Sequence, residues 1–280
     1  MTATGTAREA AGLGVPAVVE AAGIAALAGA LAGLLVGIGA RVAMRVVGSM
    51  TDASLVGIAQ TNNGFTVGNV TAIGTFGLIL FGGFAPGFVG GAAYAAARPW
   101  LAPLGRWGGL AFGLVLLGAL GPLVLEPFNI DFRKFGVPLV NVAMFTLLFP
   151  LFGVALGIAL PRVERSVRGA RGASLWPVLA IVAVPALVLI FVLGLVSVFG
   201  TSLDGGDIGQ AGAAFLYLLA APVVLRIVLS LGLRPMEQAR TFDDVRALGR
   251  PVQVVTYAVL LAPALLIAPA TLDAIRFLAR

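Results

Sequence analysis

The chain has 280 residues, of which 60% are hydrophobic and only 11% are charged, and its formal net charge is +6. Soluble domains carry roughly 25% charged residues, so this composition predicts an integral membrane protein. The chain has no Cys and no His, which excludes disulfides, thiolate catalysis, haem ligation, Ser-His catalysis and metal sites built on these residues. The positive charge is typical of Arg in membrane-protein loops and does not indicate a nucleic-acid partner.

Long apolar runs predict an all-α, polytopic transmembrane helix bundle that forms one integral membrane domain over residues 1–280. The first run, residues 21–40, is too long for a cleavable signal peptide, so we interpret it as a retained span. Seven spans are predicted, at about 17–50, 72–97, 107–125, 137–160, 175–199, 213–233 and 252–272.

The first two spans carry stripes of small residues at intervals of four. On one helix face, such a stripe lets the backbone of a neighbouring helix approach closely. We therefore predict a packing seam in which the first span contacts the second. The residues of this seam are Gly29, Gly33, Gly37, Gly83, Gly87 and Gly91.

Polar residues gather at one side of the predicted bundle, after the first and third spans and before the second. One hypothesis is a cup at the outer face that attracts an anion; the alternative is a set of surface loops whose charges pair with one another. We also predict that Arg41 is buried and pairs with Glu126 or Asp131, because an unpaired charge at the membrane edge is costly. The candidate ligand-binding residues are Arg41, Arg45, Asn69, Thr71, Thr75, Glu126, Asp131 and Arg133.

Basic residues are more numerous in the N-terminal stretch and in the loops after the second, fourth and sixth spans than on the other side. The positive-inside rule then places the N-terminus in the cytoplasm and the C-terminus outside. On the inner side, residues 235–248 are predicted to form a surface helix at the membrane interface. There, Arg226 is predicted to pair with Glu20; the alternative is that Arg226 alone reaches the lipid phosphates.

Spans two, four and six each carry a proline twelve residues before an arginine. This spacing favours three related hairpins plus an added seventh helix, a pattern found among transporters; coincidence is the alternative, because proline and arginine are common at these places. The pairs are Pro86 and Arg98, Pro150 and Arg162, and Pro222 and Arg234.

Three features between Leu34 and Arg165 resemble a group of uncharacterised actinobacterial multi-pass membrane proteins. They are the segment 41–45, the Gly-, Thr- and Asn-rich stretch that ends at Gly74-Thr75, and the sequence 131–133 before a Phe-rich span. The resemblance implies a bacterial plasma membrane protein and brings no activity with it.

The sequence contains no motif of a known enzyme class, and we predict no catalytic residue, cofactor or metal site. The first hypothesis is a non-enzymatic protein that binds or conducts a small polar or anionic ligand, or a lipid headgroup, at its outer face. The alternative is an accessory or scaffold subunit of a larger membrane complex, and an intramembrane enzyme that uses Glu126 or Asp131 is the least favoured. The expected partners are membrane lipid and either other membrane subunits or further copies of the chain.

Overall fold

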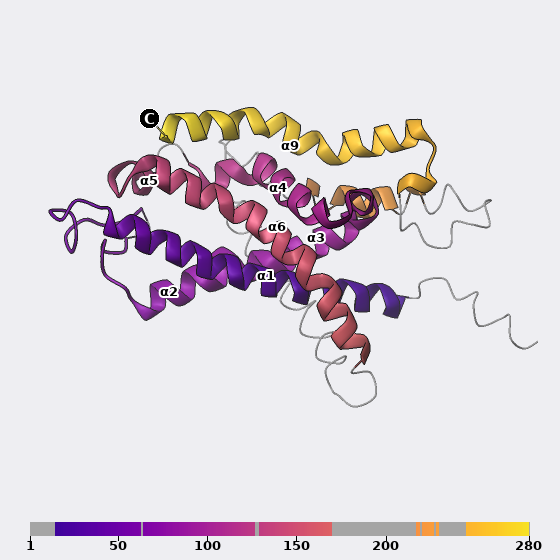
Figure 1. Ribbon diagram of the computed structural model, residues 1–280, viewed down its shortest axis with the longest axis horizontal. Coiled ribbons are helices and arrows are strands. Elements are labelled where there is room, and N and C mark those ends of the chain that lie inside the picture. The colour runs from indigo at the N-terminus through magenta and orange to yellow at the C-terminus, as the bar shows by residue number, and fades with distance from the viewer. Residues whose placement is uncertain are drawn as a thin grey trace, which may run out of the picture.

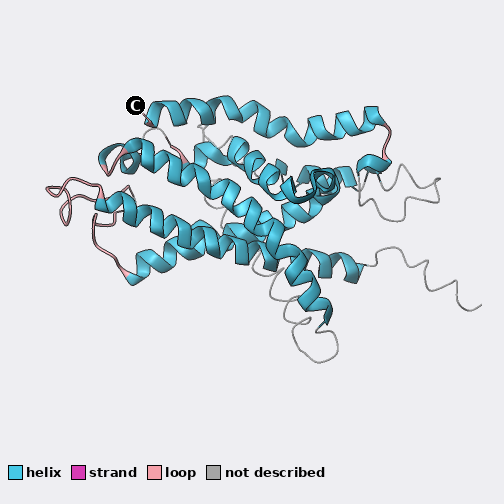
Figure 2. Cartoon of the chain, viewed as in Figure 1, coloured by secondary structure: helices cyan, strands magenta, loops and turns pink. Residues whose placement is uncertain are grey.

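The computed structural model describes residues 15–62, 64–126, 129–169, 217–218, 220–226, 228–229 and 245–279, and this part of the chain is all-α, as predicted (Figure 1). Helices are joined by loops and turns (Figure 2), with one isolated antiparallel bridge between Gln60 and Thr66. The elements are α1 (Val15–Ser49), α2 (Ala72–Ile79), the π-helix η1 (Leu80–Phe84), α3 (Ala85–Leu101), the 3-10 helix η2 (Ala102–Trp107), α4 (Gly108–Val124), α5 (Ile130–Lys134), α6 (Pro138–Gly169), the 3-10 helix η3 (Val245–Ala247) and α9 (Arg250–Leu278).

Four segments are long and apolar enough to cross a membrane: Gly23–Ser49, Ala72–Val124, Pro138–Val167 and Arg250–Leu278. The second has 53 residues, about 80 Å of helix against a bilayer core of about 30 Å. It is interrupted in η2 by Gly105, whose φ of 52° and ψ of −125° are not helical. The predicted span at 175–199 lies outside the described residues, and the one at 213–233 lies partly outside them, so the count of seven stays a prediction.

Along the two glycine stripes, the backbone of α1 closely approaches the backbone of α3, of η1 and of the end of α2. A methyl group built at Gly33 would lie 2.9 Å from Cα of Gly87, and one built at Gly37 would lie 2.8 Å from Cα of Ile79. Side chains do not fit at such distances, so glycine makes this approach possible. The structure places all six predicted seam residues here: Gly29, Gly33, Gly37, Gly83, Gly87 and Gly91.

The π-helix η1 lies within this seam and ends two residues before Pro86. A proline has no N–H, and its ring clashes with the carbonyl four residues earlier in a regular α-helix. The wider π turn, in which the Ala85 N–H donates to the Leu80 carbonyl, changes the register just ahead of the proline. The chain thereby continues from α2 into α3 without a break.

α4 and α6 form a second close contact. A methyl group built at Gly113 would lie 2.8 Å from Cα of Pro150. The glycines of α6 at this contact follow Pro150 by three and seven residues, whereas the α3 seam glycines follow Pro86 by one and five. The two seams therefore use different faces relative to the proline. Because Arg234 lies outside the described residues, the three-hairpin repeat stays a prediction.

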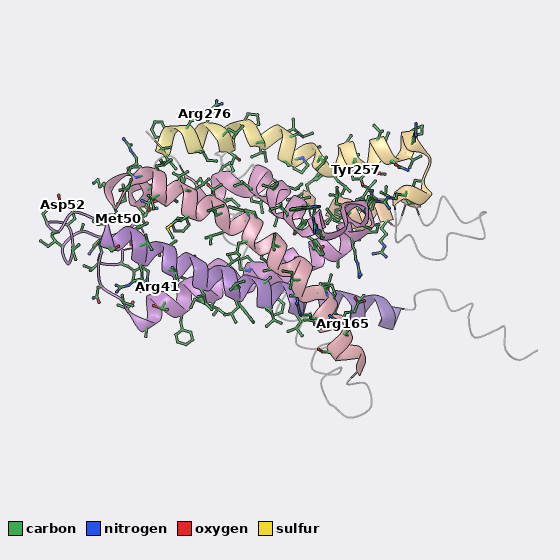
Figure 3. All side chains as sticks on the ribbon, viewed as in Figure 1. Arg41, Met50, Asp52, Arg165, Tyr257 and Arg276 are labelled. Carbon is green, nitrogen blue, oxygen red and sulfur yellow. The ribbon has the colours of Figure 1, made fainter. Side chains whose placement is uncertain are left out.

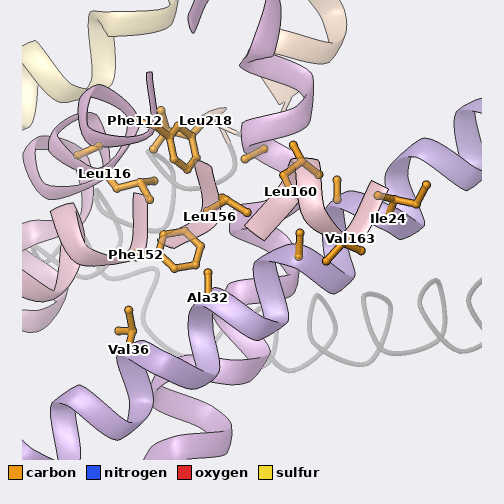
Figure 4. Close-up of a cluster of buried hydrophobic side chains, with 14 of the residues drawn as sticks. Ile24, Ala32, Val36, Phe112, Leu116, Phe152, Leu156, Leu160, Val163 and Leu218 are labelled. Atoms are coloured by element: carbon orange, nitrogen blue, oxygen red, sulfur yellow. The ribbon is translucent and has the colours of Figure 1, made fainter. Parts of the chain in front are cut away.

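α1, α4 and α9 run in one direction, and α3 and α6 run in the other. α6 is antiparallel to α1: a methyl group built at Gly39 would lie 3.2 Å from the Leu148 side chain, and Ile24 lies beside Val163 at the far end (Figure 4). Between these helices lies the main apolar core, in which Leu156 is fully buried. α1, α4 and α9 finish at the same end of the bundle, and we call this end the Arg41 end.

The two ends are closed differently. At the Arg41 end, the loop after α1 packs through Val67 against α1 and against Phe135. At the opposite end, Trp100 packs with Val245 and Leu248. Figure 3 shows Asp52 and Arg276 at the first end and Arg165 at the second. The rest of the predicted surface helix, 235–244, lies outside the described residues.

Replacement of Gly87 by Ala tests the seam. Its methyl group would lie 2.9 Å from Cα of Gly33 and would also meet the Gly29 carbonyl. Because backbone atoms cannot rotate away, we expect a loss of about 1–3 kcal/mol of stability. Gly77→Ala is the matched control, since a methyl group there meets nothing within 4 Å. Equal melting temperatures for the two variants in detergent would contradict the packing role.

Candidate ligand-binding site

The loop between α1 and α2 is folded over the Arg41 end by local hydrogen bonds. The Gln60–Thr66 bridge closes a turn that contains Gly64, whose φ of 77° suits glycine. The Thr51 hydroxyl accepts a hydrogen bond from the Gly136 N–H at 3.0 Å, which ties α1 to the segment before α6. The loop therefore forms a fixed cover over the space between the helices.

Beneath this cover lies a cavity of about 800 Å³, bounded by α1, α2, η1, α3, α4, α5 and α6. This volume lies within the usual range for ligand pockets, about 300–1,000 Å³. Its inner walls are apolar and include Val36, Leu116, Leu120, Phe149 and Phe152. Its polar lining residues are Arg41, Thr51, Thr61, Thr66, Asn69, Thr71, Asn129, Asp131 and Asn141.

Arg41 brings a cation to this cavity from α1, on the side that faces α2 (Figure 3). It is partly buried and lies eight residues before the end of α1. Among the described residues, no hydrogen bond or ion pair of Arg41 is present. The predicted pairing with Glu126 or Asp131 is therefore wrong, because Glu126 is exposed and the Asp131 carboxylate has another partner. The guanidinium is left with its donors available at the cavity wall.

Asn141, at the beginning of α6, is a buried polar residue of the cavity that the sequence prediction missed. Its side chain is 2% exposed, and its Nδ2 donates to the Phe135 carbonyl. Its Oδ1 accepts no hydrogen bond within the described part of the chain. Buried acceptors are nearly always satisfied, so this oxygen is an exception; it is enclosed by protein atoms and does not open onto the cavity. An Asn inside an apolar span is a signal that would have found it.

Asp131 belongs to α5, which Asn129 caps by accepting from the Asp131 N–H at 2.9 Å. The Asp131 carboxylate accepts a hydrogen bond from the Asn62 N–H at 2.8 Å. Burial raises the pKa of Asp131 above its ordinary value of 3.8, and this hydrogen bond partly offsets the effect. The carboxylate thus holds the covering loop in place, although its burial makes the charged form less favourable.

The structure brings four of the eight predicted cup residues to the cavity: Arg41, Asn69, Thr71 and Asp131. Thr71 also caps α2, since its hydroxyl accepts from the Gly74 N–H at 3.0 Å. The other four do not line the cavity. These are Arg45 and Glu126, which are exposed; Thr75, whose hydroxyl donates to the Thr71 carbonyl; and Arg133, whose guanidinium lies 5.5 Å from the centre of the Phe277 ring.

The Glu20–Arg226 pair at the other end stays a prediction, because the Glu20 side chain is not among those described. At that end Arg98 and Glu164 form an ion pair at 3.6 Å. No group of three acidic residues that could hold a metal ion occurs in the described part of the chain.

Comparison with known proteins finds no matching protein family, curated protein or solved structure.

Asp131→Asn tests the electrostatics of the cover. The amide oxygen of Asn can still accept from the Asn62 N–H, while the buried charge is removed. The pKa of Asp131 in the folded state lies above 3.8, so the native state binds more protons than the unfolded state. Stability therefore falls as pH rises from the unfolded-state pKa through the folded-state pKa of this group. The melting temperature of the variant, relative to the natural chain, should therefore increase from pH 4 to pH 7.

Asp52→Asn is the control, for which we expect the opposite pH dependence of the relative melting temperature. Hydrogen bonds from the backbone and hydroxyl of Ser54 lower the pKa of Asp52, so its carboxylate adds stability as pH rises. Because this change takes place at and below the ordinary pKa of 3.8, the relative melting temperature of this variant should decrease as pH rises from about 2 to 5. The same trend in both variants would contradict the assignment.

Proposed function

We propose that this chain is a multi-pass membrane protein that binds a small anionic ligand or an anionic lipid headgroup at the Arg41 end of the cavity. The observation that carries the proposal is Arg41 itself, a partly buried cation at the wall of an otherwise largely apolar cavity with no carboxylate partner among the described residues. A charged residue inside a membrane span faces protein or a cavity, and such a residue is a functional-site candidate by default.

The polar lining supports an anionic ligand, because hydroxyl and amide groups can complete the coordination of a phosphate or carboxylate held by a guanidinium. Thr66, Asn69 and Thr71, in the covering loop itself, supply these groups. Asp131 disfavours an anion while it is ionised, and its raised pKa lessens that penalty. The proposal is binding, with or without transfer across the membrane, and assigns no catalytic residue.

Arg41→Gln in the full chain, reconstituted in phosphatidylcholine nanodiscs, tests this proposal. The probes are sn-glycerol 3-phosphate and phosphatidylglycerol. A hydrogen bond to a charged group contributes about 1.5–3 kcal/mol, and 1.4 kcal/mol is tenfold in affinity, so binding should weaken by at least about tenfold. Arg45→Gln removes the same charge one helical turn away, at an exposed site outside the cavity. Unchanged binding in Arg41→Gln, or an equal loss in both variants, would refute the role of Arg41.

We further propose that the Arg41 end faces the outside of the cell, as the distribution of Arg in the loops indicates. The absence of Cys from the sequence makes this testable with single introduced thiols. Ser54→Cys, in the exposed covering loop, should react with a membrane-impermeant maleimide in whole cells. Arg106→Cys, exposed in η2 at the opposite end, should react only after the membrane is permeabilised. The reverse labelling pattern would show the opposite orientation.

The alternative, a scaffold subunit, is supported by α9. This helix packs mainly on α4 and leaves Val254, Val255, Leu265 and Leu266 at least 60% exposed. An apolar face of this kind suits either lipid or another membrane helix. Native mass spectrometry of the purified protein would distinguish a monomer with bound lipid from an assembly of subunits.

A further inference from the structure

The cavity continues past Arg41 toward the middle of the bundle. On α1 it extends from Arg41 to Gly33, a distance of about 12 Å along the helix axis. Over this distance its walls are apolar or glycine, and they include Val36 and Phe152. The helices that carry Val36 and Phe152, α1 and α6, belong to segments that are long and apolar enough to cross a membrane. A small anion held at Arg41 would leave this inner part unused.

Water is a poor occupant of the inner part. A buried water needs two to four polar partners, and the residues around Val36, Leu116, Leu120 and Phe152 offer apolar side chains. An acyl or other hydrocarbon chain needs no hydrogen bonds and matches these walls. The cavity therefore combines a site for an anion at one end with a site for a hydrocarbon chain at the other.

We infer that the ligand is an anionic amphiphile, with its charged head at Arg41 and a hydrocarbon chain in the inner cavity between α1, α4 and α6. This inference rests on the proposed function and names the ligand class for the same site.

The test fills the inner cavity without changing its charged end. Val36→Phe adds a ring where the side chain lines the cavity and is 9% exposed. Val42→Phe adds the same ring on the same helix, at a position that is 53% exposed and outside the cavity. Leu120→Trp fills the space from α4 and provides a second, independent variant. Each full-length variant is placed in phosphatidylcholine nanodiscs and titrated with labelled lysophosphatidylglycerol, with empty discs as background.

We expect Val36→Phe and Leu120→Trp to bind lysophosphatidylglycerol at least about tenfold more weakly than the natural chain, and Val42→Phe to bind it normally. The melting temperature of each variant is measured alongside; a loss in Leu120→Trp with an unchanged melting temperature counts for the inference even if Val36→Phe unfolds. Normal binding in a folded cavity-filling variant, with loss in Arg41→Gln, overturns the hydrocarbon site and leaves the anion site standing. Normal binding in Arg41→Gln as well overturns both.

Discussion

The contact between α1 and α3 is the constraint on which the rest of the structure depends. In lipid, the hydrophobic effect does not drive helices together, so close packing and hydrogen bonds must do so. Gly33 and Gly87 bring the two backbones close enough that a methyl group at either position would lie 2.9 Å from the other's Cα. At these glycines no side chain fits between the two backbones, and the seam fixes which side of α1 remains for α6.

The cavity arises because α1 has different neighbours on its two sides. The glycine side is held tight against α3, whereas the other side meets α6 through larger groups such as Leu148, Phe152 and Leu156. α1 and α6 cross at an angle (Figure 1), so they are close at the crossing and farther apart toward the Arg41 end. The space between them there is closed by the loop that Thr51 and Asp131 hold in place. A pocket with apolar walls and a polar cover is the geometric result.

The sequence was sufficient to predict the helical class, an interruption between residues 97 and 107, and the glycines that meet at the seam. These features depend on local composition and on a period of four, which a single sequence displays directly. It was not sufficient to predict which polar residues share the cavity. Thr75 does not line the cavity, and its hydroxyl donates to the Thr71 carbonyl at the start of its own helix. Arg133 does not line it either, and its guanidinium lies over the Phe277 ring. Such choices depend on the rotation of each helix about its axis, which is set by tertiary packing.

Arg41 and Arg45 show how one helical turn separates two environments for the same residue type. Four residues on a helix correspond to about 400° of rotation, so Arg45 lies farther along α1 and about 40° round from Arg41. That shift carries Arg45 to an exposed position while Arg41 stays partly buried at the cavity wall. A cation at the middle of a span costs about 2.5–3.5 kcal/mol on insertion scales, and a position nearer the helix end costs less. No carboxylate in the described chain offsets this cost for Arg41. A bound anion would offset it, and the apolar space beyond Arg41 decides what kind of anion fits.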